Sequence, residues 1–146
     1  MKNEPEVLLI DDNPADIELT VDALTRSKRR FHVNAVTDGE EALVFLRRQD
    51  KYAQAPAPDL VVLDLNLPRK DGRELLASLK SDPGLARIPV IIFTTSQASS
   101  DITRSYELGA NCYLRKPGNL PEFIAVVQSM ADFWLGVVSL PHKEKK

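Results

Sequence analysis

Cysteine and histidine are scarce in this sequence, and neither sign of charge dominates it. The single cysteine, Cys112, cannot form a disulfide within the chain, and two distant histidines, His32 and His142, do not make a zinc pattern. With 19 basic and 21 acidic residues the formal net charge is −2, so no global field favours nucleic acid or an anionic membrane as a partner. A reducing, cytoplasmic setting is the default expectation for such a chain.

Long apolar runs and glycine-rich phosphate loops are also missing. The apolar run near the N-terminus, Val7–Ile10, is too short for a signal peptide, and we expect no later segment to approach a membrane-spanning length. Neither G-x-x-x-x-G-K-[ST] nor G-x-G-x-x-G occurs, so the usual signatures of nucleotide binding are lacking. The 146 residues, 43% of them hydrophobic, fit one globular domain, 1–146, with an ordered core at about 5–135 and a basic tail at about 140–146.

Short apolar runs are present, and they alternate with segments of helical periodicity. The expected strands are residues 7–10, 31–36, 60–63, 90–93 and 112–114. The expected helices are one that begins at Pro14 after the cap Asn13, one capped by Thr37 with Glu40, and residues 71–81, 101–108 and 120–135. Five alternations predict a doubly wound, flavodoxin-like α/β fold with a five-stranded parallel sheet in the order 2-1-3-4-5.

Polar side chains follow four of the five expected strands. Asp11 and Asp12 follow the first, Asp64 the third, Thr94 the fourth, and Lys116 the fifth. Because the carboxyl ends of parallel strands meet at one edge, we expect these side chains to lie together. Two carboxylates 4 Å apart repel by about 4 kcal/mol at an effective dielectric constant near 20. Lys116 can neutralise one of them, and a donor set made only of oxygen favours Mg²⁺ for the rest.

Such a site is suited to transferring a phosphoryl group. Mg²⁺ and an ammonium neutralise charge on the phosphoryl oxygens, a carboxylate is the nucleophile, and a hydroxyl can bond the product. Each residue alone has a simpler interpretation: Asp64 as a loop cap, Thr94 as a turn former, Tyr113 as an edge residue, and Lys116 as a solvated side chain. The joint position on one edge is what favours the functional interpretation.

Four stretches of the chain, in order, resemble the receiver domain of two-component response regulators: LLIDDN, VVLDLNLPRKDG, IIFTTS and GANCYLRKP. The resemblance covers about residues 5–135. It implies that Asp64 accepts a phosphoryl group from the histidine of a sensor kinase. It also implies that Asp12 binds Mg²⁺ directly, Asp11 mainly through water, and Asn66 through its backbone carbonyl.

The same resemblance assigns the residues that respond to phosphorylation. Lys116 would pair with Asp64 and then with the phosphoryl oxygens, and a cis peptide bond before Pro117 would aim it. Thr94 would be the switch hydroxyl, and Tyr113 the aromatic side chain that turns inward when Thr94 moves.

Two further positions would set how long the acyl phosphate lasts. Asn66 lies two residues after the acceptor and Ser96 two residues after the switch threonine. The family uses these positions to place or block the attacking water, and small polar groups at both should leave water access open. The sequence does not give the lifetime itself.

A narrower resemblance concerns the partners. The segments DLNLPRKDGRE and FTTS and the final helix ending in FWL are similar to single-domain regulators of bacterial phytochrome-type histidine kinases, which implies a red-light-sensing kinase upstream. Eleven residues after Leu135 hold no output domain, so output is expected through a change of partner or onward relay.

Apolar residues beyond what the last helix needs to cover the sheet predict a homodimer through the fourth helix, fifth strand and fifth helix. They are Phe133, Trp134, Val137 and Val138, with Ile102 and Tyr106 nearby. The alternative is that these residues fold back onto their own domain. The direction in which phosphorylation would shift a dimer, the downstream target and the kinase itself are not given by the sequence.

Three other functions would share some of these features. A phosphohydrolase of the haloacid dehalogenase type needs a second carboxylate where Asn66 stands. An FMN carrier shares the topology, but the acidic loop after Ile10 opposes a bound phosphate. An interaction module that no longer takes phosphate would not need the full set of site residues. Beyond its own phosphorylation and dephosphorylation, we expect no enzymatic activity.

Overall fold

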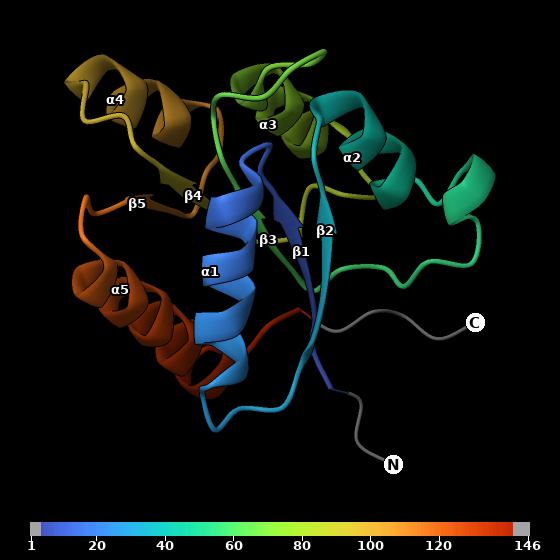
Figure 1. Cartoon of the computed structure of the whole chain (residues 1–146). Helices are drawn as coiled ribbons and strands as arrows, with labels where there is room; N and C mark the ends of the chain where they lie inside the picture. Colours follow the sequence, from blue (N-terminus) through green and yellow to red (C-terminus); the bar gives the residue numbers. More distant parts are fainter. Residues whose placement is uncertain (1–3, 142–146) are drawn as a thin grey trace.

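A central parallel sheet organises the structure, a computed structural model that describes residues 4–141 (Figure 1). Its strands are β1 (Glu6–Ile10), β2 (His32–Val36), β3 (Leu60–Leu63), β4 (Val90–Thr94) and β5 (Cys112–Arg115). They are ordered β2-β1-β3-β4-β5, and every neighbouring pair is parallel. This confirms the predicted order 2-1-3-4-5.

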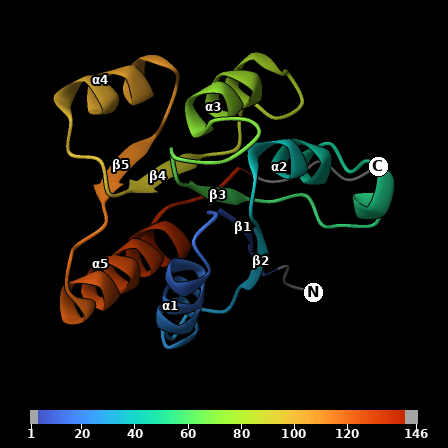
Figure 2. The same cartoon turned by 45° about the horizontal axis from the view of Figure 1, so that its top comes forward.

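Helices cover both faces of the sheet, as Figure 2 shows. The helices α1 (Pro14–Thr25) and α5 (Leu120–Asp132) lie on one face, and α2 (Gly39–Leu46), α3 (Gly72–Ser81) and α4 (Ser99–Glu107) lie on the other. A 3-10 turn at Asp50–Tyr52 follows α2, and a π-helical turn at Phe133–Val137 continues α5.

The hydrophobic core is split into two layers by the sheet. Alternate residues of the central strands point to opposite faces, so Leu8 and Leu63 pack with α2 and α3, whereas Leu9 and Val62 pack with α1 and α5. Because both faces are covered, the strands read as unbroken apolar runs instead of alternating ones. The polar residues that follow these strands therefore stand out in the sequence.

Two helix starts differ from the sequence prediction. The helix predicted to be capped by Thr37 is capped by Asp38, whose Oδ1 accepts the backbone N–H of Glu41 at 2.7 Å. The two acids are three residues apart, so this carboxylate reaches the helix and the threonine lies outside it. Helix α4 begins at Ser99, two residues before the predicted start.

One helical stretch, Leu120–Val137, is long and apolar enough to cross a membrane, with a mean hydropathy of 1.2 over 18 residues. The expectation that no segment approaches a membrane-spanning length was therefore wrong. The core helix of a globular protein passes the same test, and Phe123, Val127 and Met130 of this stretch are buried against the sheet.

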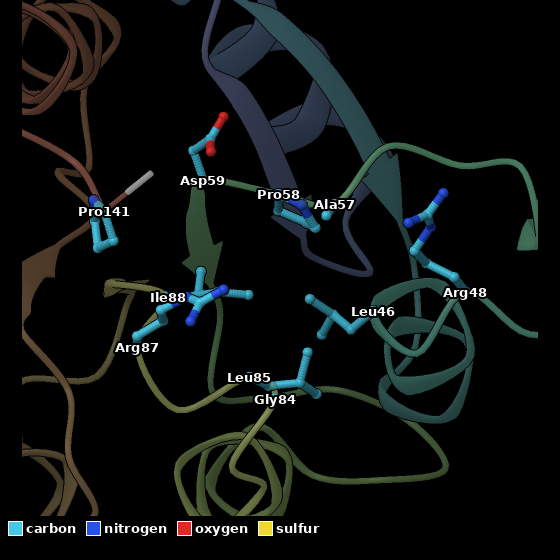
Figure 3. A pocket seen from close by; sticks show the side chains of 10 residues that line it. All are labelled: Leu46, Arg48, Ala57, Pro58, Asp59, Gly84, Leu85, Arg87, Ile88 and Pro141. Atoms are coloured by element: carbon cyan, nitrogen blue, oxygen red, sulfur yellow. The ribbon is translucent and has the colours of Figure 1, made fainter. Parts of the chain in front are cut away.

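The C-terminal part of the described chain returns toward the amino ends of the strands. Leu140 packs partly against the core, and Pro141 lines a pocket of about 180 Å³ (Figure 3). The other side chains around this pocket include those of residues 57–59, Gly84, Leu85, Arg87 and Ile88. Residues 142–146 of the predicted tail lie outside the described part. Residues 57–59 come just before β3, so the pocket lies at the end of the sheet opposite to Asp64.

Candidate functional site

The backbone ladder of the sheet places the predicted site residues. The N–H of Asp64 donates to the carbonyl of Ile10 at 2.9 Å, and the N–H of Lys116 donates to the carbonyl of Thr94 at 2.7 Å. Strand pairing thus continues one residue past β3 and β5. The residues that follow the strands are fixed relative to one another before any side-chain contact is made.

Lys116 lies at the centre of the site, and its side chain is 3% exposed. Its Nζ donates to Asp11 Oδ2 at 2.7 Å, to Asp64 Oδ2 at 2.9 Å and to Asp16 Oδ2 at 2.9 Å. The structure thus contains the Lys116–Asp64 ion pair implied by the sequence. A buried ammonium is tolerated because each of its three protons meets a carboxylate.

The charges in this cluster shift one another's pKa values. Burial alone would lower the pKa of Lys116, but hydrogen bonds to Asp11 and Asp16 and the charge of Asp64 outweigh it, so the pKa is raised. Burial raises the pKa of Asp11, and the hydrogen bond from Lys116 offsets only part of that effect. The ammonium therefore stays charged across the physiological range.

Three carboxylates form a group that could hold a metal ion. One oxygen from each of Asp11, Asp12 and Asp64 lies within 4.8 Å of the others. Asp11 and Asp64 are buried, whereas Asp12 is exposed. Oxygen donors with one side open to water fit a hard divalent cation, which keeps part of its water shell. Whether Asp12 ligates directly and Asp11 through water stays a prediction.

The segment after Asp64 is held close to this carboxylate. The N–H of Asn66 donates to Asp64 Oδ1 at 3.3 Å. Gly72, the first residue of α3, lies directly against this turn. A Cβ at that position would lie 2.4 Å from the carbonyl oxygen of Asp64, so there is no room for a side chain. Asp71 caps α3 in a capping box with Glu74. Asp71 and Gly72 therefore permit the close approach of α3 to Asp64.

The predicted switch residues lie on the same edge. Thr94 is fully buried, and its Oγ1 has no hydrogen-bond partner among the described residues. Tyr113 packs partly against the core, and its hydroxyl donates to the carbonyl of Ser96 at 3.0 Å. The hydroxyl of Ser96 in turn donates to Asp101 Oδ2 at 2.6 Å.

The prediction of a cis peptide bond before Pro117 was wrong. No cis peptide bond occurs among the described residues, so the bond between Lys116 and Pro117 is trans. The trans form is favoured by about 0.5–1 kcal/mol for a residue before proline. From this trans backbone Lys116 reaches Asp64, its predicted partner, and also Asp11.

Two features of the site were missed by the sequence reasoning. Asp16 bonds Lys116, although an acid in the first turn of α1 is usually a favourable charge at a helix N-terminus. Arg73 on α3 bonds Asp101 on α4 through both Nε and Nη2. The sequence carried a weak signal for Asp16, which lies four residues after Asp12. It carried no signal for the contact between Arg73 and Asp101.

The comparisons with known proteins agree with this geometry. Residues 7–128 match the response regulator receiver domain. Response regulator Rcp1 of Synechocystis sp. is 46% identical over 140 residues, which cover 95% of each chain.

Two solved structures are similar over nearly their whole length. The Mn²⁺-bound form of Rcp1 has a TM-score of 0.91 at 44% identity, over 94% of this chain and 99% of that one. The phosphorylated cyanobacterial phytochrome response regulator RcpA has a TM-score of 0.92 at 46% identity, over 96% and 100%. With the acid group and its lysine at the carboxyl edge of the sheet, these matches show that the chain belongs to the response regulator receiver domains, among relatives of the phytochrome response regulators.

Proposed function

We propose that this response regulator accepts a phosphoryl group on Asp64 in a reaction that requires Mg²⁺. The single observation that carries the proposal is the position of Lys116 Nζ, 2.9 Å from Asp64 Oδ2 and beside the acid group of Asp11 and Asp12. A carboxylate oxygen of Asp64 forms the new bond to phosphorus as the bond from phosphorus to the nitrogen of a kinase phosphohistidine breaks, and that nitrogen keeps the electron pair.

The residues of the site divide the work of this transfer. One N–H of Lys116 that donates to Asp64 would then donate to a phosphoryl oxygen. The positive charge of the ammonium would offset the negative charge of the incoming phosphoryl group. Asp11, Asp12, Asp64 and the carbonyl of Asn66 would hold Mg²⁺, which neutralises phosphoryl oxygens when bound. A relative binds Mn²⁺ and another is phosphorylated, which supports both parts of the proposal.

The response to phosphorylation would begin at Thr94. Its hydroxyl has no partner in the described structure, so a phosphoryl oxygen on Asp64 would give it one. Movement of Thr94 would be passed to Tyr113 and Ser96, which are already joined by a hydrogen bond. Asn66 and Ser96 would set access of water to the acyl phosphate.

The partner would be a phytochrome-type sensor histidine kinase in the cytoplasm, as the phytochrome regulators among the relatives suggest. The protein would act on no substrate other than itself. Its output would be a change of partner, which includes a second copy of the chain bound on the face formed by α4, β5 and α5.

A groove supports the choice of that face for the second copy. It measures about 350 Å³ and lies between the edge strand β5 and α5, lined by Leu114, Val126, Met130, Phe133 and other mostly apolar side chains. Phe133, which lines the groove, is 52% exposed, and Val137, four residues later in the chain, is 71% exposed. A surface that offers both a groove and protruding apolar residues is suited to a two-fold contact with itself.

Incubation with acetyl phosphate, read by intact mass, tests the phosphorylation. We expect the wild-type chain to gain one phosphoryl group with Mg²⁺ and none with a chelator. Asp64→Asn should gain none, whereas Asp22→Asn, a change of an exposed carboxylate on α1, should behave as wild type. A wild-type chain that never gains mass would leave an interaction module as the better description.

A further inference from the structure

Lys116 is shared between the metal carboxylates and one acid that stands apart from them. Its ammonium has three N–H donors, and Asp11, Asp16 and Asp64 take one each. Among residues 4–141, the acid group that can hold a metal consists of Asp11, Asp12 and Asp64, and Asp16 is not part of it. The third N–H of Lys116 is therefore bound outside the metal group.

Asp16 is held in this position by helix α1 and not by a flexible loop. Asn13 caps α1, and its Oδ1 accepts the backbone N–H of Asp16 at 3.1 Å. The Asp16 side chain is 22% exposed, compared with 2% for Asp11 and 9% for Asp64. It lines a cavity of about 190 Å³ together with Lys116, Pro117 and Asn119. Asp16 thus approaches Lys116 from the side of α1 that borders solvent.

An ammonium and a divalent cation compete for the same two carboxylates. If Lys116 bonded only Asp11 and Asp64, its charge would sit beside the metal position and repel a cation there. A third carboxylate that holds one N–H and offsets part of that charge reduces the competition. Residues outside a coordination shell act on metal affinity through the groups that they orient.

We propose that Asp16 is a positioning residue for the phosphorylation reaction: it takes one N–H of Lys116 and offsets part of its charge, and so lessens the competition between this ammonium and the divalent cation for Asp11 and Asp64. This inference rests on the proposed function of the same site. During phosphoryl transfer the bonds from Lys116 to Asp11 and Asp16 remain, and only the N–H now on Asp64 passes to a phosphoryl oxygen.

Calorimetric titration of the full chain with Mn²⁺ and with Mg²⁺ tests the proposal without any phosphorylation. Asp16→Ala should raise the dissociation constant about tenfold, the lower end of the effect typical of outer-shell partners. Asp16→Asn should show a smaller rise, because its amide oxygen still accepts the N–H of Lys116. Asp22→Ala removes an equal charge from the same helix, away from the site, and should leave the constant unchanged.

A double-mutant cycle shows whether Asp16 acts through the lysine. In a Lys116→Met background, Asp16→Ala should no longer change the dissociation constant. An equal effect with and without Lys116, or a constant for Asp16→Ala that matches Asp22→Ala, would overturn the proposal.

The phosphorylation assay gives a second readout of the same inference. The Mg²⁺ concentration for half-maximal phosphorylation of Asp16→Ala should rise by the same factor as the dissociation constant, while the rate at saturating Mg²⁺ stays that of wild type. A rate that is lost at every Mg²⁺ concentration would contradict a role through the metal. Metal binding by a wild-type chain that takes no phosphoryl group would refute the proposed function separately.

Discussion

At the scale of single residues, two buried threonine hydroxyls lack a hydrogen-bond partner among the described residues, and only one of them lies at the candidate site. Thr20 on α1 and Thr94 at the end of β4 are fully buried, and in the described part of the chain neither Oγ1 has a hydrogen-bond partner. An unsatisfied buried hydroxyl costs about 1–3 kcal/mol of stability. Only Thr94 lies beside Asp64 and Lys116 at the carboxyl edge of the sheet, where a phosphoryl oxygen would satisfy it.

Replacement of Thr94 by valine should therefore stabilise the protein and impair its response. We expect Thr94→Val to raise the free energy of unfolding by roughly 1 kcal/mol, because a methyl group replaces an unpaired hydroxyl of similar size. The phosphorylated variant should lack the change at residues 94–99 and Tyr113 that we expect of the wild type. Urea unfolding measures the first effect, and NMR spectra with and without acetyl phosphate measure the second.

Thr20→Val is the matched control for this prediction. It removes the second unpaired hydroxyl, so it should stabilise the protein to a similar extent while the spectra on phosphorylation stay those of wild type. If Thr94→Val kept the full spectral change, Thr94 would not be the switch hydroxyl.

At the scale of secondary structure elements, a polar network joins α3 to the segment between β4 and α4. Arg73 on α3 bonds Asp71, the cap of its own helix, and Asp101 on α4, with Nη2 to Asp101 Oδ1 at 2.9 Å. Asp101 also accepts the hydroxyl of Ser96. The network therefore connects the loop after Asp64 to the loop after Thr94.

The loss of Arg73 should loosen this connection. With both side chains partly exposed, we expect Arg73→Gln to lower the free energy of unfolding by about 1 kcal/mol at neutral pH. Arg104→Gln, which removes a more exposed arginine from α4, should cost much less. Equal losses in the two variants, measured by urea unfolding, would show that the network contributes no more than a surface ion pair.

The pH dependence of this effect has a definite sign. The hydrogen bond from Ser96, and then that from Arg73, lowers the pKa of Asp101 below its ordinary value. A lowered pKa adds stability above the pKa of the unfolded chain, near 3.9, and this contribution is lost as the pH falls through the folded value. The difference between Arg73→Gln and wild type should therefore be constant above about pH 5 and shrink below about pH 4.

At the scale of the whole molecule, the last helix serves both the core and an exposed face. Trp134 and Leu135 pack partly against the core, while Phe133 and Val137 stay exposed. Trp134 and Leu135 thus fold back onto the domain, as one interpretation of the sequence expected. Phe133 and Val137 stay exposed, and the dimer contact through them stays a prediction.

Removal of the exposed ring should weaken the proposed dimer. We expect Phe133→Glu to be monomeric at tens of micromolar by light scattering, because a charge would enter the apolar groove between β5 and α5. Leu120→Glu introduces the same charge at the other end of α5, on a side chain that is 51% exposed, and should dimerise as wild type. If the wild-type chain stays monomeric both with and without phosphorylation, the proposed dimer is refuted.

The sequence by itself determined the alternation of strands and helices, the order of the sheet and the main members of the site. These follow from short-range patterns: apolar runs of four or five residues mark buried strands, and the residue after each run must lie at the same edge because all strands are parallel. Asp11, Asp64 and Lys116 were found in this way.

Only the tertiary structure decided the contacts that link distant segments. Lys116 lies 100 residues from Asp16 and meets it because α1 packs beside α5 over the same edge. Arg73 meets Asp101 because α3 and α4 lie on one face of the sheet, and the bond before Pro117 is trans. Local periodicity cannot give such contacts, since the packing of separate helices on the sheet decides which side chains come within a hydrogen bond of one another.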